Sequence, residues 1–246
     1  MEDLADDALA GVELLKARKS VSATEIGISG VSQGGWITPL AATRSKAVAF
    51  LVVRSASGIN PMDQSIFNVE NALRRAGYGE SVVARATELR KRLYELARSG
   101  VPDPGLPGAL EAAHSEPWFK DSALPYPLSV ASISPGERRF LTFEPLPAWE
   151  KVTVPVLAIW GGSDIEVPAG RSRDLIEAAL ERGGNHDHSL VLYPAADHAL
   201  RIVRETGVSW DFPRTAPGAR LLIAEWLREH VHTAGRTRSG VEEWTP

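Results

Sequence analysis

The sequence predicts an α/β fold in which a parallel β-sheet is flanked by helices. Four short apolar segments alternate with longer amphipathic ones, at residues 25–29, 47–53, 154–160 and 189–193. Alternation of this kind is typical of strand–helix–strand units, whose strands lie parallel in one sheet. The 47–53 segment is almost continuously apolar, as expected of a parallel strand buried on both faces.

The first part of the chain is expected to form a helix, a strand–turn–helix unit and a second strand. Residues 2–18 have an apolar stripe at helical spacing, formed by Leu4, Ala8, Val12 and Leu15. Acidic residues near the start of this segment and basic residues near its end suit the helix dipole. The strand at 25–29 leads into a helix at 36–45, with Pro39 in or near its first turn, where proline is tolerated.

Residues 60–149 differ from the rest of the chain and predict a helical lid inserted into the sheet domain. Two helices are expected, at 63–76 and 80–99, because each has apolar residues at helical spacing. Nine prolines follow between Pro102 and Pro147. Prolines at this density exclude a central strand, so we expect an irregular return path after the two helices.

The sheet pattern then resumes. A helix at 168–181 lies between the last two strands and is followed by the stop signal Gly183-Gly184-Asn185. A last amphipathic helix is expected at 215–232. We therefore divide the chain into an α/β core at 1–59 and 150–234, a helical lid at 60–149 and a polar tail at 235–246.

Composition and charge narrow the class of function. The chain of 246 residues has a formal net charge of −4, so it has no basic excess to neutralise nucleic-acid phosphates. It has no cysteine, which excludes disulfides, a cysteine nucleophile and thiolate metal sites. No apolar run approaches the roughly 18 residues of a membrane span, and the first residues do not resemble a signal peptide. We expect no cofactor and no nucleic-acid or membrane partner; localisation stays unassigned, with the cytoplasm as default.

Ser32 is the candidate nucleophile. It is the centre of Gly30-Val31-Ser32-Gln33-Gly34, between an apolar strand and a helix, a pattern that indicates a sharp turn exposing the serine hydroxyl. We expect Gly30 and Gly34 to lie where a Cβ atom would clash. The first N–H groups of the following helix would stabilise an oxyanion above the serine. An ordinary glycine-rich strand–helix connection is the alternative interpretation.

Two further loops carry groups that such a serine needs. A serine hydroxyl requires a base within hydrogen-bond reach, and the base requires a third group to hold its tautomer. Asp164 follows the strand at 154–160, and His198 follows the strand at 189–193. Because the carboxyl ends of parallel strands meet at one edge of a sheet, we expect Ser32, Asp164 and His198 to lie close together.

On these residues the sequence resembles the α/β-hydrolase superfamily, and within it the serine esterase and dipeptidyl- or acylaminoacyl-peptidase-like branch. The chain order serine, acid, histidine is the same. The matching segments are Gly30 to Gly35, Trp160 to Pro168 and Asp197-His198. The likeness covers residues 1–58 and 150–232. It implies these roles: Ser32 as nucleophile, His198 as general base and then acid, Asp164 as orienting carboxylate, and the backbone N–H of Gln33 as an oxyanion donor.

Several neighbouring residues have two interpretations. Glu166 is an alternative carboxylate, although its position in the loop favours a solvent-exposed side chain, and Asp197 is expected to be a loop or capping residue. Trp36 and Trp160 flank the expected site, where they either line an acyl pocket or pack against the sheet edge. Arg54 either binds a substrate carboxylate or forms a structural ion pair.

The other histidines do not predict a metal site. His186 and His188 have the H-x-H spacing of metal ligands, but no carboxylate pattern or cysteine accompanies them, so we expect a solvated loop. His114, His230 and His232 are expected at the surface.

The resemblance also implies an N-terminally truncated core, which lacks the first strands of the superfamily's sheet. The superfamily usually has eight strands, and residues 2–18 match the helix just before the strand that leads to the serine. The strand at 25–29 would then be an apolar edge strand, through which self-association can occur. A loop that supplies a second oxyanion donor would be absent too, and losing one such donor typically costs about 10²–10³-fold in turnover.

The leading hypothesis is a serine hydrolase that cleaves an ester, thioester or small peptide bond through an acyl-enzyme on Ser32. Its activity would be reduced where part of the oxyanion hole is missing. The alternatives are a catalytically weakened hydrolase-fold protein that binds a ligand or partner, and an acyltransferase, which the same three residues support. The predicted lid contains no motif that identifies the substrate.

Overall fold

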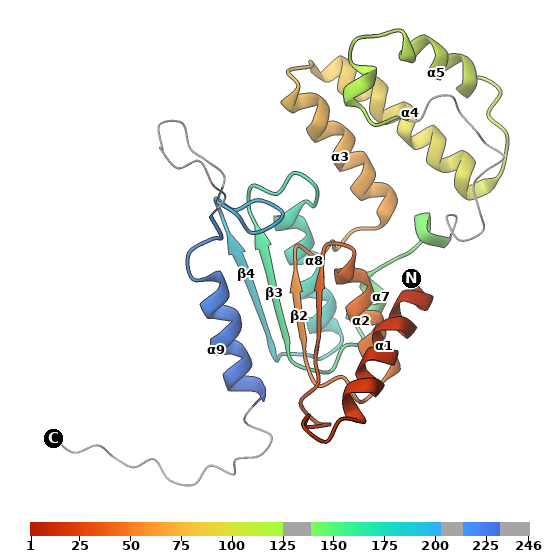
Figure 1. Ribbon diagram of the computed structural model, residues 1–246. Helices are drawn as coiled ribbons and strands as arrows, with labels where there is room; N and C mark the ends of the chain where they lie inside the picture. Colours follow the sequence, from red (N-terminus) through yellow and green to blue (C-terminus); the bar gives the residue numbers. More distant parts are fainter. Residues whose placement is uncertain (125–138, 203–213, 232–246) are drawn as a thin grey trace.

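The computed structural model describes residues 1–124, 139–202 and 214–231. Within these residues four parallel strands form one sheet in the order β1-β2-β3-β4. The strands are β1 (Ile28–Val31), β2 (Leu51–Arg54), β3 (Val156–Gly161) and β4 (His188–Tyr193) (Figure 1). Their carboxyl ends therefore lie at one edge, and the expected parallel α/β sheet is confirmed.

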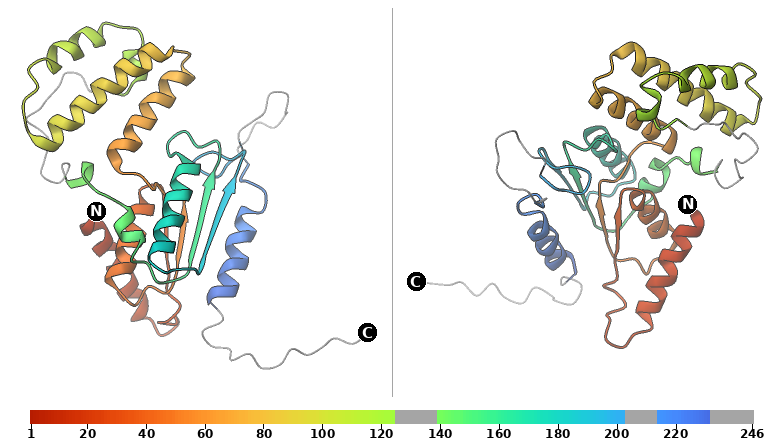
Figure 2. Two further views of the ribbon diagram at one scale, coloured as in Figure 1. Left: turned by 180° about the vertical axis from the view of Figure 1, so that it is seen from behind. Right: turned by 45° about the horizontal axis from the view of Figure 1, so that its top comes forward.

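Helices cover both faces of this sheet. On one face lie α1 (Glu2–Lys16), α2 (Gly34–Arg44), α7 (Leu146–Trp149) and α8 (Ala169–Arg182), and on the other lies α9 (Ala219–Val231) (Figures 1 and 2). Successive residues of a strand point to opposite faces. Accordingly, Leu51 and Val53 pack in the core beneath α2 and α8, whereas Val52 packs against Trp226 of α9. This double burial explains the continuous apolar run at 47–53.

A separate group of helices lies between β2 and β3 in the chain, beyond the carboxyl ends of the strands (Figure 1). We call it the helical insertion, and it consists of α3 (Pro61–Arg75), α4 (Glu80–Ser99), α5 (Leu106–His114) and the 3₁₀ turn η1 (Phe119–Asp121). It has a hydrophobic core of its own, which includes Leu73, Leu89, Leu110 and Trp118. The division of the chain into core, lid and tail stays a prediction.

Some local expectations are wrong. The segment after α4 is not irregular throughout, because residues 106–114 form α5 with Pro107 in its first turn, where a missing N–H is tolerated. Pro39 lies inside α2, since that helix already begins at Gly34. The buried side of α1 includes Ala5 and Val12, whereas Leu4 and Leu15 of the expected stripe are exposed.

Other expectations fall on residues that the structure does not describe. The polar tail at 235–246, His232 and the prolines at 125, 127 and 135 lie outside the described residues. Among the described helices, none combines the length and the apolar character that a membrane span requires.

Within the described residues, β1 is an edge strand of the sheet. It pairs with β2 on one side, and no strand of the described residues pairs with its other side. Ser29 is exposed, and Val31, on the same face of the strand, is 41% exposed. Unpaired edges with exposed apolar side chains favour association with another strand. Self-association through this edge stays a prediction.

If β1 mediates self-association, Ser29→Lys will lower the weight-average mass at high protein concentration, because a charge on an edge strand opposes pairing with a second edge. Sedimentation velocity over a concentration series measures this mass. Ser20→Lys adds the same charge to the exposed connection between α1 and β1 and is the control. Equal behaviour of the two variants, or a monomer at every concentration for the unmodified chain, would contradict the prediction.

Candidate active site

Ser32 directly follows β1 in a strained turn. Its φ is +54°, in the left-handed region that residues other than glycine seldom adopt. The Ser32 N–H donates to the carbonyl of Arg54 at 2.9 Å, and the Ser32 carbonyl accepts from the N–H of Gly35 at 2.8 Å. Such strain costs about 1–3 kcal/mol and clusters at functional sites. The turn is thus held from both sides, by the end of β2 and by the first turn of α2.

Two glycines allow the close approaches of this turn. A Cβ atom on Gly30 would lie 2.6 Å from the carbonyl oxygen of Gly34, and one on Gly35 would lie 2.3 Å from Cβ of Ala56. A Cβ atom on Gly34 would meet nothing within 4 Å. The expected role of Gly30 is therefore confirmed, and that of Gly34 is wrong. Gly35 provides the second close approach, which brings α2 against the chain after β2.

The start of α2 offers a hydrogen-bond donor next to Ser32. Gln33 is the N-cap of α2, and its backbone N–H donates to no other described residue, whereas the N–H groups of Gly35 and Trp36 are bonded within the turn. A free N–H at a helix N-terminus stabilises a nearby negative charge.

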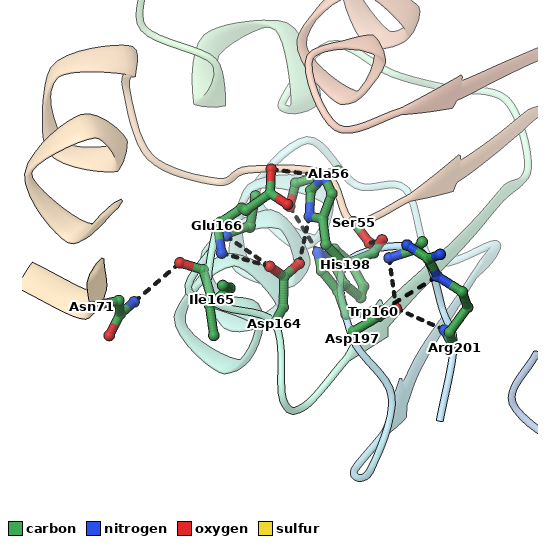
Figure 3. Close-up of polar contacts among 12 residues, drawn as sticks. Ser55, Ala56, Asn71, Trp160, Asp164, Ile165, Glu166, Asp197, His198 and Arg201 are labelled. Carbon is green, nitrogen blue, oxygen red and sulfur yellow. Dashed lines mark hydrogen bonds and ion pairs between the residues drawn. The ribbon is translucent and has the colours of Figure 1, made fainter. Parts of the chain in front are cut away.

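Asp164 and His198 are in direct contact (Figure 3). Nδ1 of His198 lies 2.7 Å from Oδ2 of Asp164. The Asp164 side chain has 0% exposure, and its Oδ1 accepts from the backbone N–H groups of Glu166 at 2.8 Å and Val167 at 3.0 Å. These donors satisfy a buried carboxylate and fix its orientation.

This contact changes the acidity of His198. The hydrogen bond to Asp164 raises the pKa of His198 above its ordinary value of 6.5, while partial burial of the imidazole acts in the opposite direction. The negative charges of Asp164, Glu166 and Asp197 raise this pKa further.

Backbone contacts bring His198 from the end of β4 to the end of β2. A Cβ atom on Gly161 would lie 2.2 Å from the carbonyl oxygen of Asp197, so the loop after β4 rests directly on the end of β3. Beyond that point, the hydroxyl of Ser55 donates to the carbonyl of His198 at 2.7 Å. Ser55 is the first residue after β2. His198 therefore follows β4 in the chain but is bound at the end of β2, two strands away in the sheet.

Ser32 and His198 are both bonded to the same dipeptide. The Ser32 N–H bonds to Arg54, and the His198 carbonyl accepts from Ser55. Among the described residues no hydrogen bond joins the Ser32 hydroxyl to His198, and Nε2 of His198 lies 3.9 Å from Oε2 of Glu166. Asp164 therefore binds His198 directly, whereas Ser32 is bound through its backbone to the end of β2.

The two tryptophans are buried and bind the chain after β2. The indole N–H of Trp36 donates to the Ser57 carbonyl at 2.9 Å, and that of Trp160 donates to the Ala56 carbonyl at 2.7 Å. Trp160 has 0% exposure. These contacts agree with the packing interpretation, and contact of either ring with a substrate stays a prediction.

The charged neighbours of the site differ in their contacts. Arg54 is half-buried and forms no ion pair within the described residues, so the expected structural pair is not found there; substrate binding by Arg54 stays a prediction. Oδ1 of Asp197 accepts from the N–H groups of Ala199 and Arg201, which confirms its capping role. The Glu166 side chain is 57% exposed, as expected for a residue outside the buried acid position.

Two histidines differ from expectation. His188 is the first residue of β4 rather than part of a solvated loop, and its side chain is only 10% exposed. His230 is partly buried, because its ring stacks on Trp226 with centroids 4.0 Å apart. The described residues contain no cluster of three or more side chains suited to hold a metal ion.

Sequence reasoning missed three contributors to this site. Ser55 and the Gly161-Gly162 pair contact the His198 loop. Of these, only the glycine pair could be recognised in the sequence, because it follows the predicted strand at 154–160. Asn71 of α3 donates to the Ile165 carbonyl at 3.2 Å, which joins the helical insertion to the loop of Asp164. No local pattern distinguishes that asparagine from any polar residue of a surface helix.

Known proteins share this arrangement of strands. Residues 10–99 match the family described as BAAT / Acyl-CoA thioester hydrolase C terminal. The chain is 28% identical over 199 residues to Esterase EstD of Thermotoga maritima, over 81% of this chain and 40% of that protein.

The structure superposes on 2,6-dihydroxy-pseudo-oxynicotine hydrolase with a TM-score of 0.51 and 15% identity, over 99% of this chain and 51% of that one. Dipeptidyl peptidase 4 of Porphyromonas gingivalis also gives 0.51, at 13% identity, over 92% of this chain and 22% of that one. The fold is that of the α/β-hydrolase superfamily.

The α/β-hydrolase fold explains why Ser32, Asp164 and His198 follow strands of one parallel sheet. The chain spans 40% of the length of Esterase EstD and 51% of that of the oxynicotine hydrolase. The description of the matched family and the name of Esterase EstD both refer to hydrolysis of an ester or thioester, which supports a hydrolase as the class of function.

We predict that alanine has different effects on stability at Gly30 and at Gly34. Gly30→Ala lowers the free energy of unfolding by about 1–3 kcal/mol, because the new methyl group meets backbone that cannot move away. Gly34→Ala leaves it unchanged or raises it by up to about 1 kcal/mol, because the methyl group meets nothing and alanine favours a helix. Urea unfolding followed by circular dichroism measures both. Equal destabilisation by the two variants would show that Gly34 is also confined.

Proposed function

We propose that this chain carries the nucleophile, base and acid of a serine hydrolase that cleaves an ester, thioester or small peptide bond. The observation that supports the proposal most strongly is the 2.7 Å contact between His198 and a buried Asp164. It lies at the strand ends that also hold the strained Ser32 turn. In this proposal the turn is a nucleophile elbow and the helical insertion is a lid.

The proposed reaction proceeds through an acyl-enzyme. Asp164 holds Nδ1 of His198, so the neutral imidazole presents Nε2 as the base. Nε2 takes the proton of the Ser32 hydroxyl as its oxygen attacks the substrate carbonyl, and then delivers that proton to the leaving group. Water, deprotonated by the same nitrogen, cleaves the acyl-enzyme and restores the serine. Catalytic hydrogen bonds are often long before substrate binds, so Nε2 is expected to approach Ser32 on binding.

Charge stabilisation in this proposal comes from the start of α2. The oxygen of the tetrahedral intermediate would accept from the N–H of Gln33, and the positive end of the α2 dipole would favour its charge. Arg54, which has no ion pair within the described residues, would bind an anionic group of the substrate. Trp36 and Trp160 would support the acyl side of the site.

A catalytically weakened binding protein is the second candidate. The observation that favours it is the absence of a hydrogen bond between the Ser32 hydroxyl and His198 within the described residues. An unactivated serine does not react with a fluorophosphonate, so labelling of the chain distinguishes the two candidates. Acyl transfer to an acceptor other than water is a variant of the first candidate.

Ser32→Ala is expected to remove hydrolysis of a short activated ester, by roughly 10⁴-fold or more, because no other hydroxyl replaces the nucleophile. It is also expected to abolish fluorophosphonate labelling of the chain. Release of p-nitrophenol and gel fluorescence measure the two effects. Ser57→Ala, which removes a buried hydroxyl two residues beyond Ser55, is the control. Activity that survives Ser32→Ala would refute the assignment of the nucleophile.

Substitution of the two candidate carboxylates is expected to give different results. Asp164→Asn lowers kcat/KM by about 10⁴-fold, because an amide no longer holds the required imidazole tautomer. Glu166→Gln lowers it by less than about 10-fold, because an exposed charge near the imidazole is screened by solvent. Initial rates on the same ester measure both, and the reverse order would make Glu166 the acid.

The pH dependence tests the same assignment. His198 is a base only when neutral, and Asp164 raises its pKa above 6.5, so kcat/KM rises with pH through a midpoint above 6.5. In Asp164→Asn the group that raises the pKa is gone, and any residual activity has its midpoint at lower pH. A midpoint that stays in place would contradict the role of Asp164.

A further inference from the structure

We propose that Ser55 is a positioning residue for His198, whose hydroxyl holds the His198 backbone at the end of β2, beside the Ser32 turn. The proposal rests on the proposed function, because it assigns Ser55 a role in presenting the base of that reaction. Nothing in the sequence around Ser55 indicates this role, since its partner lies 143 residues further along the chain.

Ser55 has an unusual backbone conformation, and its N–H and its hydroxyl are both hydrogen-bonded. Its φ is +50°, and the residue is fully buried. Its N–H donates to the Ile159 carbonyl at 2.7 Å, and its hydroxyl donates to the His198 carbonyl at 2.7 Å. A serine in the left-handed region persists only where the surrounding structure imposes it, and such residues concentrate at functional sites.

Ser55 and Asp164 hold His198 at two different points. Asp164, after β3, binds the ring at Nδ1, and Ser55, after β2, binds the backbone carbonyl. The rest of the loop is held by bonds of its own, such as that from the N–H of Asp197 to the Arg201 carbonyl, and by bonds from other segments, such as those from the N–H of Ser163 to the Ala196 carbonyl and from the N–H of Ala216 to the Leu200 carbonyl. The ring can pivot about Cβ if only its nitrogen is bound. The second contact removes that freedom by fixing where the side chain starts.

The Ser55 contact also relates His198 to the proposed nucleophile. Arg54 accepts the hydrogen bond from the Ser32 N–H at 2.9 Å, and Ser55 is the next residue. The Arg54 carbonyl binds the Ser32 backbone, and the Ser55 hydroxyl binds the His198 backbone. These two groups belong to consecutive residues, which are joined by one peptide unit. The separation between nucleophile and base depends on this unit, and misplacement by about 1 Å can cost about 10²-fold in rate.

The test compares Ser55→Ala and Ser55→Gly with Ser57→Ala. The Ser57 hydroxyl is buried on the same segment, and among the residues that the structure describes it bonds only to Ile59. We expect both Ser55 variants to lower kcat for a p-nitrophenyl ester by about 10- to 100-fold, with KM changed by less than about 2-fold, and Ser57→Ala to retain kcat. Glycine relieves the positive φ, so Ser55→Gly loses kcat even where its thermal stability equals that of the unmodified chain.

A titration of His198 gives a readout that does not depend on turnover. The charged groups that face this imidazole are Asp164, Glu166 and Asp197. When the backbone contact is lost, the bond to Asp164 weakens, so the pKa of His198 falls toward its ordinary value and the acidic limb of the kcat/KM profile moves to lower pH. NMR of ¹⁵N-histidine-labelled protein measures this pKa, and His198→Gln identifies the resonance.

The outcomes separate this inference from the function on which it rests. Unchanged kcat and an unchanged His198 titration in both Ser55 variants would overturn it. So would a loss confined to Ser55→Ala that follows its melting temperature, because that pattern indicates a purely structural role. If ester hydrolysis is absent or survives Ser32→Ala, the proposed function fails. In that case a lowered His198 pKa in the Ser55 variants, and not in Ser57→Ala, still supports the positioning role.

Discussion

The hydrogen bond between Asp164 and His198 is the interaction on which the rest of the site depends. A buried carboxylate is costly unless its oxygens are paired, and here the backbone of the Asp164 loop supplies two donors and His198 the third. The same bond raises the pKa of the imidazole and fixes which nitrogen faces outward. The strand order, the glycine contacts and the Ser55 hydroxyl all serve to bring these two side chains together.

Close backbone approach is the means by which the fold achieves this convergence. Parallel strands deliver three loops to one edge, but neighbouring strands are about 4.8 Å apart, so His198 must still cross β3 to approach Ser32. Gly161 allows that crossing because any side chain there would occupy the place of the Asp197 carbonyl. Gly35 similarly allows α2 to contact Ala56. The site can form in this way only because Gly35 and Gly161 have no Cβ atom.

The helical insertion is connected to the site through the loop of the acid. Asn71 of α3 donates to the Ile165 carbonyl at 3.2 Å. The N–H groups of Glu166 and Val167 in turn bind Asp164. The same short loop thus receives a hydrogen bond from α3 and donates hydrogen bonds to the carboxylate that binds His198.

The sequence by itself determined the alternation of strands and helices, the Ser32 turn and the places of Asp164 and His198 at strand ends, because periodicity, glycines and strand ends are local properties. It also favoured Asp164 over Glu166 as the acid, and of the two only Asp164 is buried. Only the tertiary structure decided that Gly35 rather than Gly34 is confined, that α5 forms among prolines, and that Ser55 binds the His198 loop. Those features depend on atoms that meet in space after folding, at separations along the chain that no sequence pattern encodes.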